Sequence, residues 1–115
     1  MTTTVRGLVA AIEREVRDTE LQPARARLLI NQLPSLMASC NAEIREADVQ
    51  YAAVLLRFLD SDEAANRATI RAECSPEYRR KREARDTLKL VTELLSVMKH
   101  TLRSFTEEIR LGGRT

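Results

Sequence analysis

A chain of 115 residues suits a single domain, and its 31% charged and 43% hydrophobic residues, with a net charge of +2, are those of a soluble globular protein. Aromatic residues make up 3% of the chain, tryptophan is absent, and glycine and proline occur three times each. A β-sandwich or an α/β fold needs more turn residues and more β-branched and aromatic positions. The composition therefore predicts an all-α protein.

No apolar run reaches the roughly 18 residues of a membrane span, so we expect no membrane association. The first seven residues lack the apolar segment and the small-residue cleavage site of a secretory signal. The sequence therefore predicts a cytoplasmic location.

The first predicted element is an amphipathic helix over residues 5–20, with Thr3 or Thr4 available as its N-cap. Pro23 follows its end, and a short helix is expected over residues 24–33. Pro34 then breaks or kinks the chain, because an interior proline removes a helical hydrogen bond, and it suits the first position of a new helix.

The long helix predicted over residues 34–73 carries an apolar residue every third or fourth position without a slip. These positions are Leu33, Met37, Cys40, Ile44, Ala47, Tyr51, Val54, Phe58, Ser61, Ala65, Ala68 and Ala72. An alternative stays open: Asp60-Ser61-Asp62 breaks this helix, with Ser61 as the N-cap of a short helix that follows.

A second long helix is predicted over residues 76–110, with Ser75 as its N-cap and Pro76 as its first residue. Its heptad positions are Ala84, Leu88, Val91, Leu95, Met98, Leu102, Phe105 and Ile109, and Gly112 and Gly113 end it, which leaves residues 111–115 as a tail. A short turn at residues 74–76 predicts that the two long helices are antiparallel neighbours. That fold-back places Val54 opposite Leu95.

The predicted architecture is thus a long antiparallel, coiled-coil-like helical hairpin with one or two shorter N-terminal helices packed on it. A second apolar line beside the heptad is expected to form a belt across both long helices. Its residues are Leu55, Leu56, Leu59, Leu90, Leu94 and Val97. Because a two-helix hairpin buries only one seam per helix, we expect this belt to be covered in a homo-oligomer, as part of a helical bundle.

Two acidic motifs, Glu43-x-x-Glu46 and Glu83-x-x-Asp86, resemble the metal-binding pattern of the all-α nucleotide pyrophosphohydrolases of the MazG and dimeric dUTPase type. The resemblance implies Mg²⁺-dependent phosphate hydrolysis. In the predicted pairing the two motifs lie about 20 residues apart along the hairpin, roughly 30 Å. We therefore treat this enzyme as a remote alternative.

No other pattern points to catalysis. His100, the single histidine, lies off both apolar lines and is expected in solvent. Cys40 is interpreted as a core residue and Cys74 as exposed, and no zinc site, phosphate loop or nucleophile–base pair is evident. The sequence predicts a non-enzymatic protein without a cofactor or a metal.

A basic run directly after the turn forms the predicted hairpin tip. It consists of Tyr78, Arg79, Arg80, Lys81, Arg82 and Arg85. These side chains suit contact with a partner protein or with the phosphates of a nucleic acid. The competing interpretation pairs them with nearby carboxylates, those of Asp62, Glu63, Glu73, Glu77, Glu83 and Asp86, which keep the tip in solution.

Residues 62–108 combine an Ala- and Glu-rich segment, Ser75-Pro76-Glu77-Tyr78, a basic run and the stretch from Leu94 to Arg103. This pattern is similar to small all-helical proteins encoded by phages and prophages, which implies an accessory or anti-defence role on host or phage nucleic-acid machinery. The leading hypothesis is a helical protein–protein interaction module. Direct nucleic-acid binding through the basic tip is the alternative.

Overall fold

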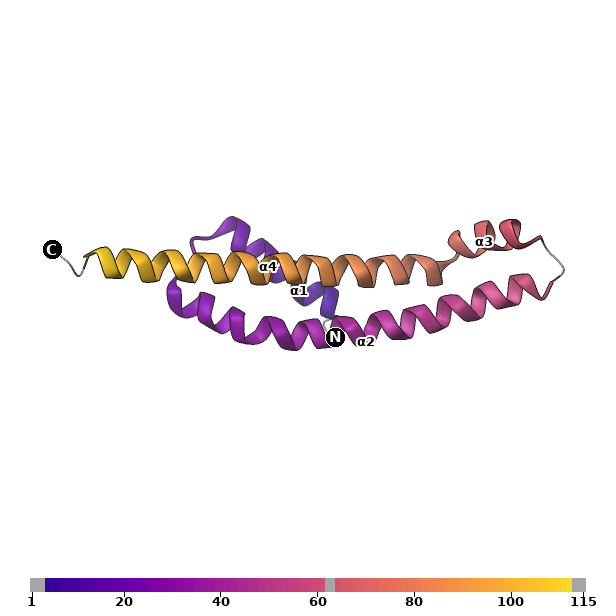
Figure 1. The fold of residues 1–115 in the computed structure, drawn as a ribbon, viewed down its shortest axis with the longest axis horizontal. Coiled ribbons are helices and arrows are strands. Elements are labelled where there is room, and N and C mark those ends of the chain that lie inside the picture. Colours follow the sequence, from indigo (N-terminus) through magenta and orange to yellow (C-terminus); the bar gives the residue numbers. More distant parts are fainter. Residues whose placement is uncertain (1–3, 62–63, 113–115) are drawn as a thin grey trace. The chain divides into compact units, whose positions relative to one another are not determined.

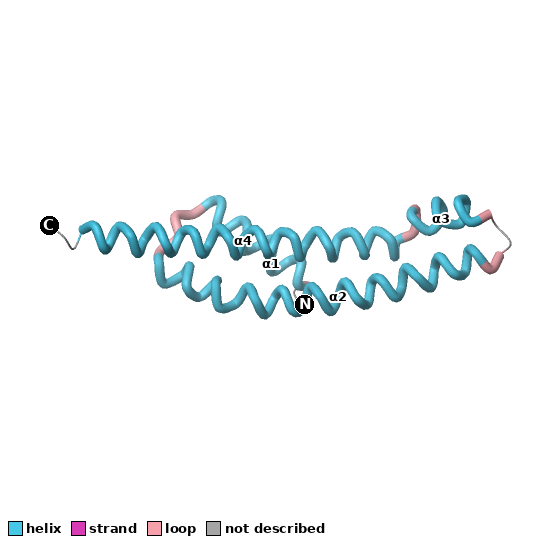
Figure 2. Tube along the Cα trace, viewed as in Figure 1, coloured by secondary structure: helices cyan, strands magenta, loops and turns pink. Residues whose placement is uncertain are grey.

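The computed structural model describes residues 4–61 and 64–112, and within them it contains four α-helices and no strand (Figure 1). They are α1 (Val5–Asp18), α2 (Pro23–Leu59), α3 (Ala65–Glu73) and α4 (Pro76–Gly112). The long helices α2 and α4 pack together, with short connections between the elements (Figure 2). The predicted all-α fold with shorter helices beside a long hairpin is confirmed.

The chain divides into two compact units. Met1–Ala38 and Lys89–Thr115 make up one, called here the terminal unit, and Ser39–Leu88 make up the other, called the hairpin unit. Both α2 and α4 contribute residues to each unit. The core of each unit is therefore built around the same two helices.

The terminal unit holds α1 against the first part of α2 and the last part of α4. Thr4 is the N-cap of α1, since its Oγ1 accepts a hydrogen bond from the backbone N–H of Gly7 at 3.0 Å. The Arg25 guanidinium donates to both carboxylate oxygens of Glu15, at 2.7 and 2.8 Å, and so ties α1 to α2. The buried side chains of this unit are Val9, Ile12, Ala26, Leu29, Leu33, Leu36, Val91, Leu94 and Met98.

Helix α2 runs through Pro34 without ending there, so the prediction of a short helix over residues 24–33 and a new helix from Pro34 is wrong. An interior proline costs about 3 kcal/mol, because it removes a backbone hydrogen bond and crowds the preceding turn. Leu33 and Leu36, on either side of it, are 0% and 7% exposed. Burial of leucines at about 1.5–3 kcal/mol each offsets that cost and keeps the helix continuous.

In the hairpin unit, α2 ends at Leu59, which confirms the alternative that the long helix breaks near residues 60–62. Ser61 does not act as the expected N-cap. Its Oγ donates to the carbonyl of Phe58 at 2.7 Å and its N–H to the same oxygen at 3.3 Å, so it closes the end of α2. Helix α3 begins at Ala65 without a side-chain cap. The predicted roles of Asp62 and Glu63 lie outside the described residues.

The connection between α3 and α4 is only Cys74 and Ser75. Cys74 has φ −88° and ψ 0°, in the bridge region beside the helical one, and the chain bends here without reversing, since α4 continues from α3 on the same side (Figure 1). Ser75 is the N-cap of α4 as predicted, since its Oγ accepts from the backbone N–H of Tyr78 at 3.2 Å. The reversal lies between α2 and α3 instead, and α3 and α4 follow each other on the returning side (Figure 1).

The pairing of α2 with the returning side is therefore not the predicted one. Tyr51 lies against Tyr78, and Arg71 of α3 lies over the ring of Phe58. In both pairs the two residue numbers add up to 129, whereas the predicted pairing of Val54 with Leu95 adds up to 149. The residue that stands opposite a given position of α2 is therefore about 20 residues earlier in the chain than predicted. The reason is that the chain turns before α3 and not after it.

The heptad seam itself is confirmed where it concerns α2. Cys40, Ala47 and Val54 are buried at seven-residue intervals, and Ala68 and Ala72 of α3 are fully buried. On α4 the buried positions of the hairpin unit are Ala84 and Thr87, whereas Leu88 is only partly buried. Ile109, predicted in the seam, is 72% exposed.

Candidate functional site

The basic run lies in the first three turns of α4, beside the middle of α2 rather than at the end of the hairpin. Arg80 donates from Nη1 to Oε1 of Gln50 at 3.3 Å. Lys81 Nζ and Arg85 Nη2 lie 3.9 and 3.3 Å from the carboxylate oxygens of Asp48. The prediction of a basic hairpin tip is wrong, because the chain reverses before α3. The whole of α3 therefore lies between the reversal and the basic run at the start of α4.

Tyr78, the aromatic member of that run, also turns inward. Its ring lies 5.3 Å from the ring of Tyr51, and Lys81 Nζ lies 4.5 Å from the Tyr51 ring centre. Burial raises the pKa of the Tyr51 hydroxyl, and the nearby Glu73 and Tyr78 raise it further. At neutral pH this phenol is neutral, and the cation of Lys81 faces its ring.

Sequence reasoning missed Asp48, Gln50 and Tyr51 as the partners of the basic run. The carboxylates expected to neutralise it were near in sequence, whereas the observed one is more than 30 residues away. The break at residues 60–62 was the signal that would have placed Asp48 beside Lys81. Arg79 and Arg82 are exposed on the outer side of α4.

The residues of the predicted apolar belt are divided between the two units. Leu55, Leu56 and Leu59 belong to the hairpin unit, and Leu90, Leu94 and Val97 belong to the terminal unit. Leu94 is 5% exposed and forms part of the core. Leu55 and Leu90 are partly buried, whereas Leu56, Leu59 and Val97 are exposed. Leu94 is therefore not available as part of an exposed belt.

The corrected pairing removes the 30 Å separation of the two acidic motifs, because Glu43 and Glu46 now stand level with Glu83 and Asp86. The carboxylates still do not converge. Glu43, Glu46 and Asp86 are exposed, and Asp86 shares the outer face of α4 with Arg79 and Arg82. Among residues 4–61 and 64–112, no three His, Cys, Asp or Glu side chains form a group that could hold a metal ion.

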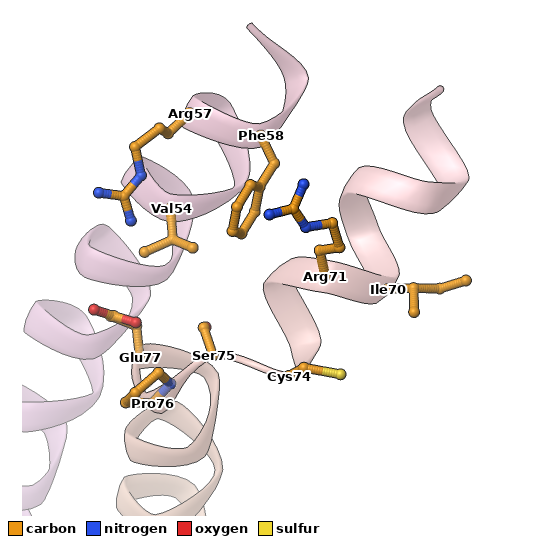
Figure 3. A pocket seen from close by; sticks show the side chains of 9 residues that line it. All are labelled: Val54, Arg57, Phe58, Ile70, Arg71, Cys74, Ser75, Pro76 and Glu77. Carbon is orange, nitrogen blue, oxygen red and sulfur yellow. The ribbon is translucent and has the colours of Figure 1, made fainter. Parts of the chain in front are cut away.

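A pocket of about 500 Å³ opens in the hairpin unit between the end of α2, α3 and the start of α4 (Figure 3). The ring of Phe58 lies at its centre, with the guanidinium carbons of Arg71 and Arg57 at 4.6 and 6.0 Å from the ring centre. Cys74, an exposed free thiol, also lines it, but its sulfur points away from Phe58 in Figure 3. The hydroxyl of Ser75, another residue of the lining, already accepts the N-cap hydrogen bond of α4.

The outer face of α2 in the hairpin unit carries a second row at heptad spacing, which sequence analysis did not identify. Its members are Ala42, Arg45, Val49, Ala52, Leu56 and Leu59, spaced 3, 4, 3, 4 and 3 residues apart. All six are exposed, and the exposed fractions of Val49, Leu56 and Leu59 are 70%, 58% and 38%. We call these six residues the outer row. It lies opposite the buried seam of the same helix.

Comparisons of the chain with models of known protein families, with curated proteins and with solved structures gave no match. None of the helices within the described residues is long and apolar enough to cross a membrane.

Proposed function

We propose that this protein is a non-enzymatic helical protein–protein interaction module, and that the outer row of α2 is its contact surface. The observation that carries the proposal is the exposure of Val49, Leu56 and Leu59 at heptad spacing on one helix face. A row of this kind is the pattern by which one helix packs against another. Single exposed leucines are ordinary, but an aligned set marks a contact site.

The two long helices differ in this respect. The exposed residues on the outer face of α4 within the hairpin unit include Arg79, Arg82 and Asp86. The corresponding face of α2 carries Arg45 as the one charge of the outer row. A helix face that only contacts solvent is expected to carry charged residues, as the outer face of α4 does. The mostly apolar outer row of α2 therefore supports a binding role.

The small core of the hairpin unit supports the same interpretation. The hairpin unit buries little, since its core side chains are mostly Ala, Val and Cys. A partner helix on the outer row would bury apolar surface that the chain leaves in water, at about 25 cal/mol per Å².

Direct nucleic-acid binding receives less support, because Lys81 and Arg85 already pair with Asp48 and Arg80 with Gln50. Phosphate contacts would fall mainly to Arg79 and Arg82. A role as a phage accessory or anti-defence protein, which the sequence resemblance implies, stays a prediction.

Site-specific photo-crosslinking tests the proposal. A photoreactive phenylalanine analogue at position 56 is expected to give one discrete protein adduct when the variant is expressed in cells. The matched control places the analogue at Glu43, which is exposed on another side of the same helix. Equal or absent adducts at positions 56 and 43 would show that the outer row is not a contact surface.

A further inference from the structure

We infer that the partner on the outer row is a second copy of this chain, whose α2 packs antiparallel with Ala52 and Ala53 at the centre of the contact. This inference rests on the proposed function and names its partner.

The row favours an antiparallel arrangement because of Arg45. In a parallel pair of helices, identical heptad positions meet, so Arg45 would face Arg45 in the centre of the contact. In an antiparallel pair centred between Ala52 and Ala53, residues whose numbers add up to about 105 stand level. Arg45 then meets Leu59 and Asp60 of the second copy, which replaces a repulsion by an attraction.

The apolar residues match in the same register. Val49 stands level with Leu56 of the second copy, and by symmetry the match occurs twice. The alanines at the centre let the two backbones approach closely, and the larger Val49 and Leu56 side chains fill the space on either side. The three most apolar members of the row are thereby removed from water together.

The charged residues beside the row are also complementary. Glu46 and Arg57 are exposed on the same side of the row, at about 80° and 100° from its midline at 100° per residue. An antiparallel two-fold arrangement brings that side against itself. Arg57 and Asp60 of one copy then stand within about three residues of level with Arg45 and Glu46 of the other, so two positive and two negative charges meet, again twice. On the other side, Asp48 is already paired with Lys81 and Arg85.

The size of the surface sets the strength of the contact. The 18 residues from Ala42 to Leu59 span about 27 Å, and a helix is about 10 Å wide. This footprint is smaller than the roughly 800 Å² per partner of a standard stable complex. We therefore expect a reversible dimer with a dissociation constant in the micromolar range rather than a permanent one.

Sedimentation velocity of the purified full-length chain, from micromolar to submillimolar concentration, tests the inference. The wild type is expected to shift from 13.1 kDa to twice that mass as the concentration rises. Glu46→Arg and Arg57→Glu should each weaken the dimer about tenfold or more, and the double exchange should restore it, because the two ion pairs re-form with reversed polarity. Circular dichroism checks that each variant keeps its helices.

Two single-cysteine variants distinguish the directions of the helices, in a chain that also carries Cys40→Ala and Cys74→Ser. Ala52→Cys should form an intermolecular disulfide, since two copies of residue 52 meet near the axis. Val49→Cys should not, because residue 49 stands about 10 Å along the helix from its own copy. Disulfides from both variants would indicate a parallel dimer and overturn the inferred arrangement.

The outcomes separate the inference from the proposed function. A purified chain that stays monomeric, together with a photo-adduct at position 56 to a different protein, overturns the second copy and leaves the interaction module intact. A monomeric chain with no specific adduct overturns both. A dimer that the charge exchange neither weakens nor restores overturns the register.

Discussion

The ring of Tyr51 in α2 lies 5.3 Å from the ring of Tyr78 in α4. This contact identifies how α2 and α4 pair within the hairpin unit, because two heptad helices can shift by whole heptads without changing which face is apolar. It also brings Lys81 and Arg85 to Asp48 and thereby turns much of the basic run toward the chain itself.

The first prediction concerns this pairing. Cysteines at positions 51 and 78, in a chain carrying Cys74→Ser, should be joined within one chain by a short bis-maleimide, as detected by mass spectrometry of the digest. Cysteines at positions 54 and 95 should not, since position 54 stands level with position 75 and Leu95 lies 20 residues beyond it, or about 30 Å along a helix. Efficient joining of 54 to 95 would restore the pairing expected from sequence.

A second prediction tests the role of Asp48. Asp48→Asn removes its pairing with Lys81 and Arg85 while keeping the shape of the side chain. Because all three side chains are partly exposed, we expect a loss of no more than about 1 kcal/mol in the free energy of unfolding in urea. The control is Asp86→Asn on the outer face of α4, which should change stability less. A larger loss in the control would mean that Asp86 has the structural role.

The neighbouring residues Leu28 and Leu29 provide a third test, of the core of the terminal unit. Leu29 is 0% exposed and Leu28 is 60% exposed. Leu29→Ala should lower the free energy of unfolding by about 2–5 kcal/mol, because it leaves a cavity. Leu28→Ala should cost well under half as much. Equal losses in chemical denaturation would contradict the observed face of α2.

The two cysteines should differ in their reaction with thiol reagents. Cys74 is exposed and should react at once with an aromatic disulfide reagent, whereas Cys40 is 0% exposed and should react only when the structure opens. Burial, with a further contribution from Glu43, raises the pKa of the Cys40 thiol above its ordinary value of 9.0.

This shift has a direction in pH. The folded state favours the neutral thiol of Cys40, so its contribution to stability is present below about pH 9 and is lost as the pH rises through the folded-state pKa. Replacing Cys40 by Ala should remove that part of the alkaline loss of stability. Equal reaction of both thiols under native conditions would show that Cys40 is not in the core.

A fifth prediction concerns the link between α1 and α2. The hydrogen bonds and the charge of Arg25 lower the pKa of the Glu15 carboxyl below its ordinary value of 4.5. The pair therefore stabilises the fold above that ordinary pKa, and its contribution is lost as the pH falls through the lower, folded-state pKa.

An NMR titration of the Glu15 side chain measures this directly. Arg25→Gln should return the pKa of Glu15 toward its ordinary value, whereas Arg17→Gln should leave it nearly unchanged. An unaltered pKa in Arg25→Gln would show that the two residues do not pair in solution.

The sequence by itself determined the local features of this protein. The low glycine and proline content and the regular spacing of apolar residues predicted the helices, and Cys40 and Val54 lie in the seam as expected. Ser75 was predicted as a cap, and Thr4 was one of two candidates with Thr3, because capping depends on residues within one turn of the helix end.

Only the tertiary structure decided where the chain reverses. The same 3, 4 spacing runs on through Ser61, Ala65, Ala68 and Ala72 whether the chain turns before α3 or after it, so periodicity cannot locate the turn. That choice depended on the helix end that Ser61 closes and on the bend at Cys74, after which α4 continues on the same side as α3. The position of the reversal places Asp48 beside the basic run and leaves the outer row of α2 exposed. Both features follow from long-range pairing rather than from neighbours in sequence.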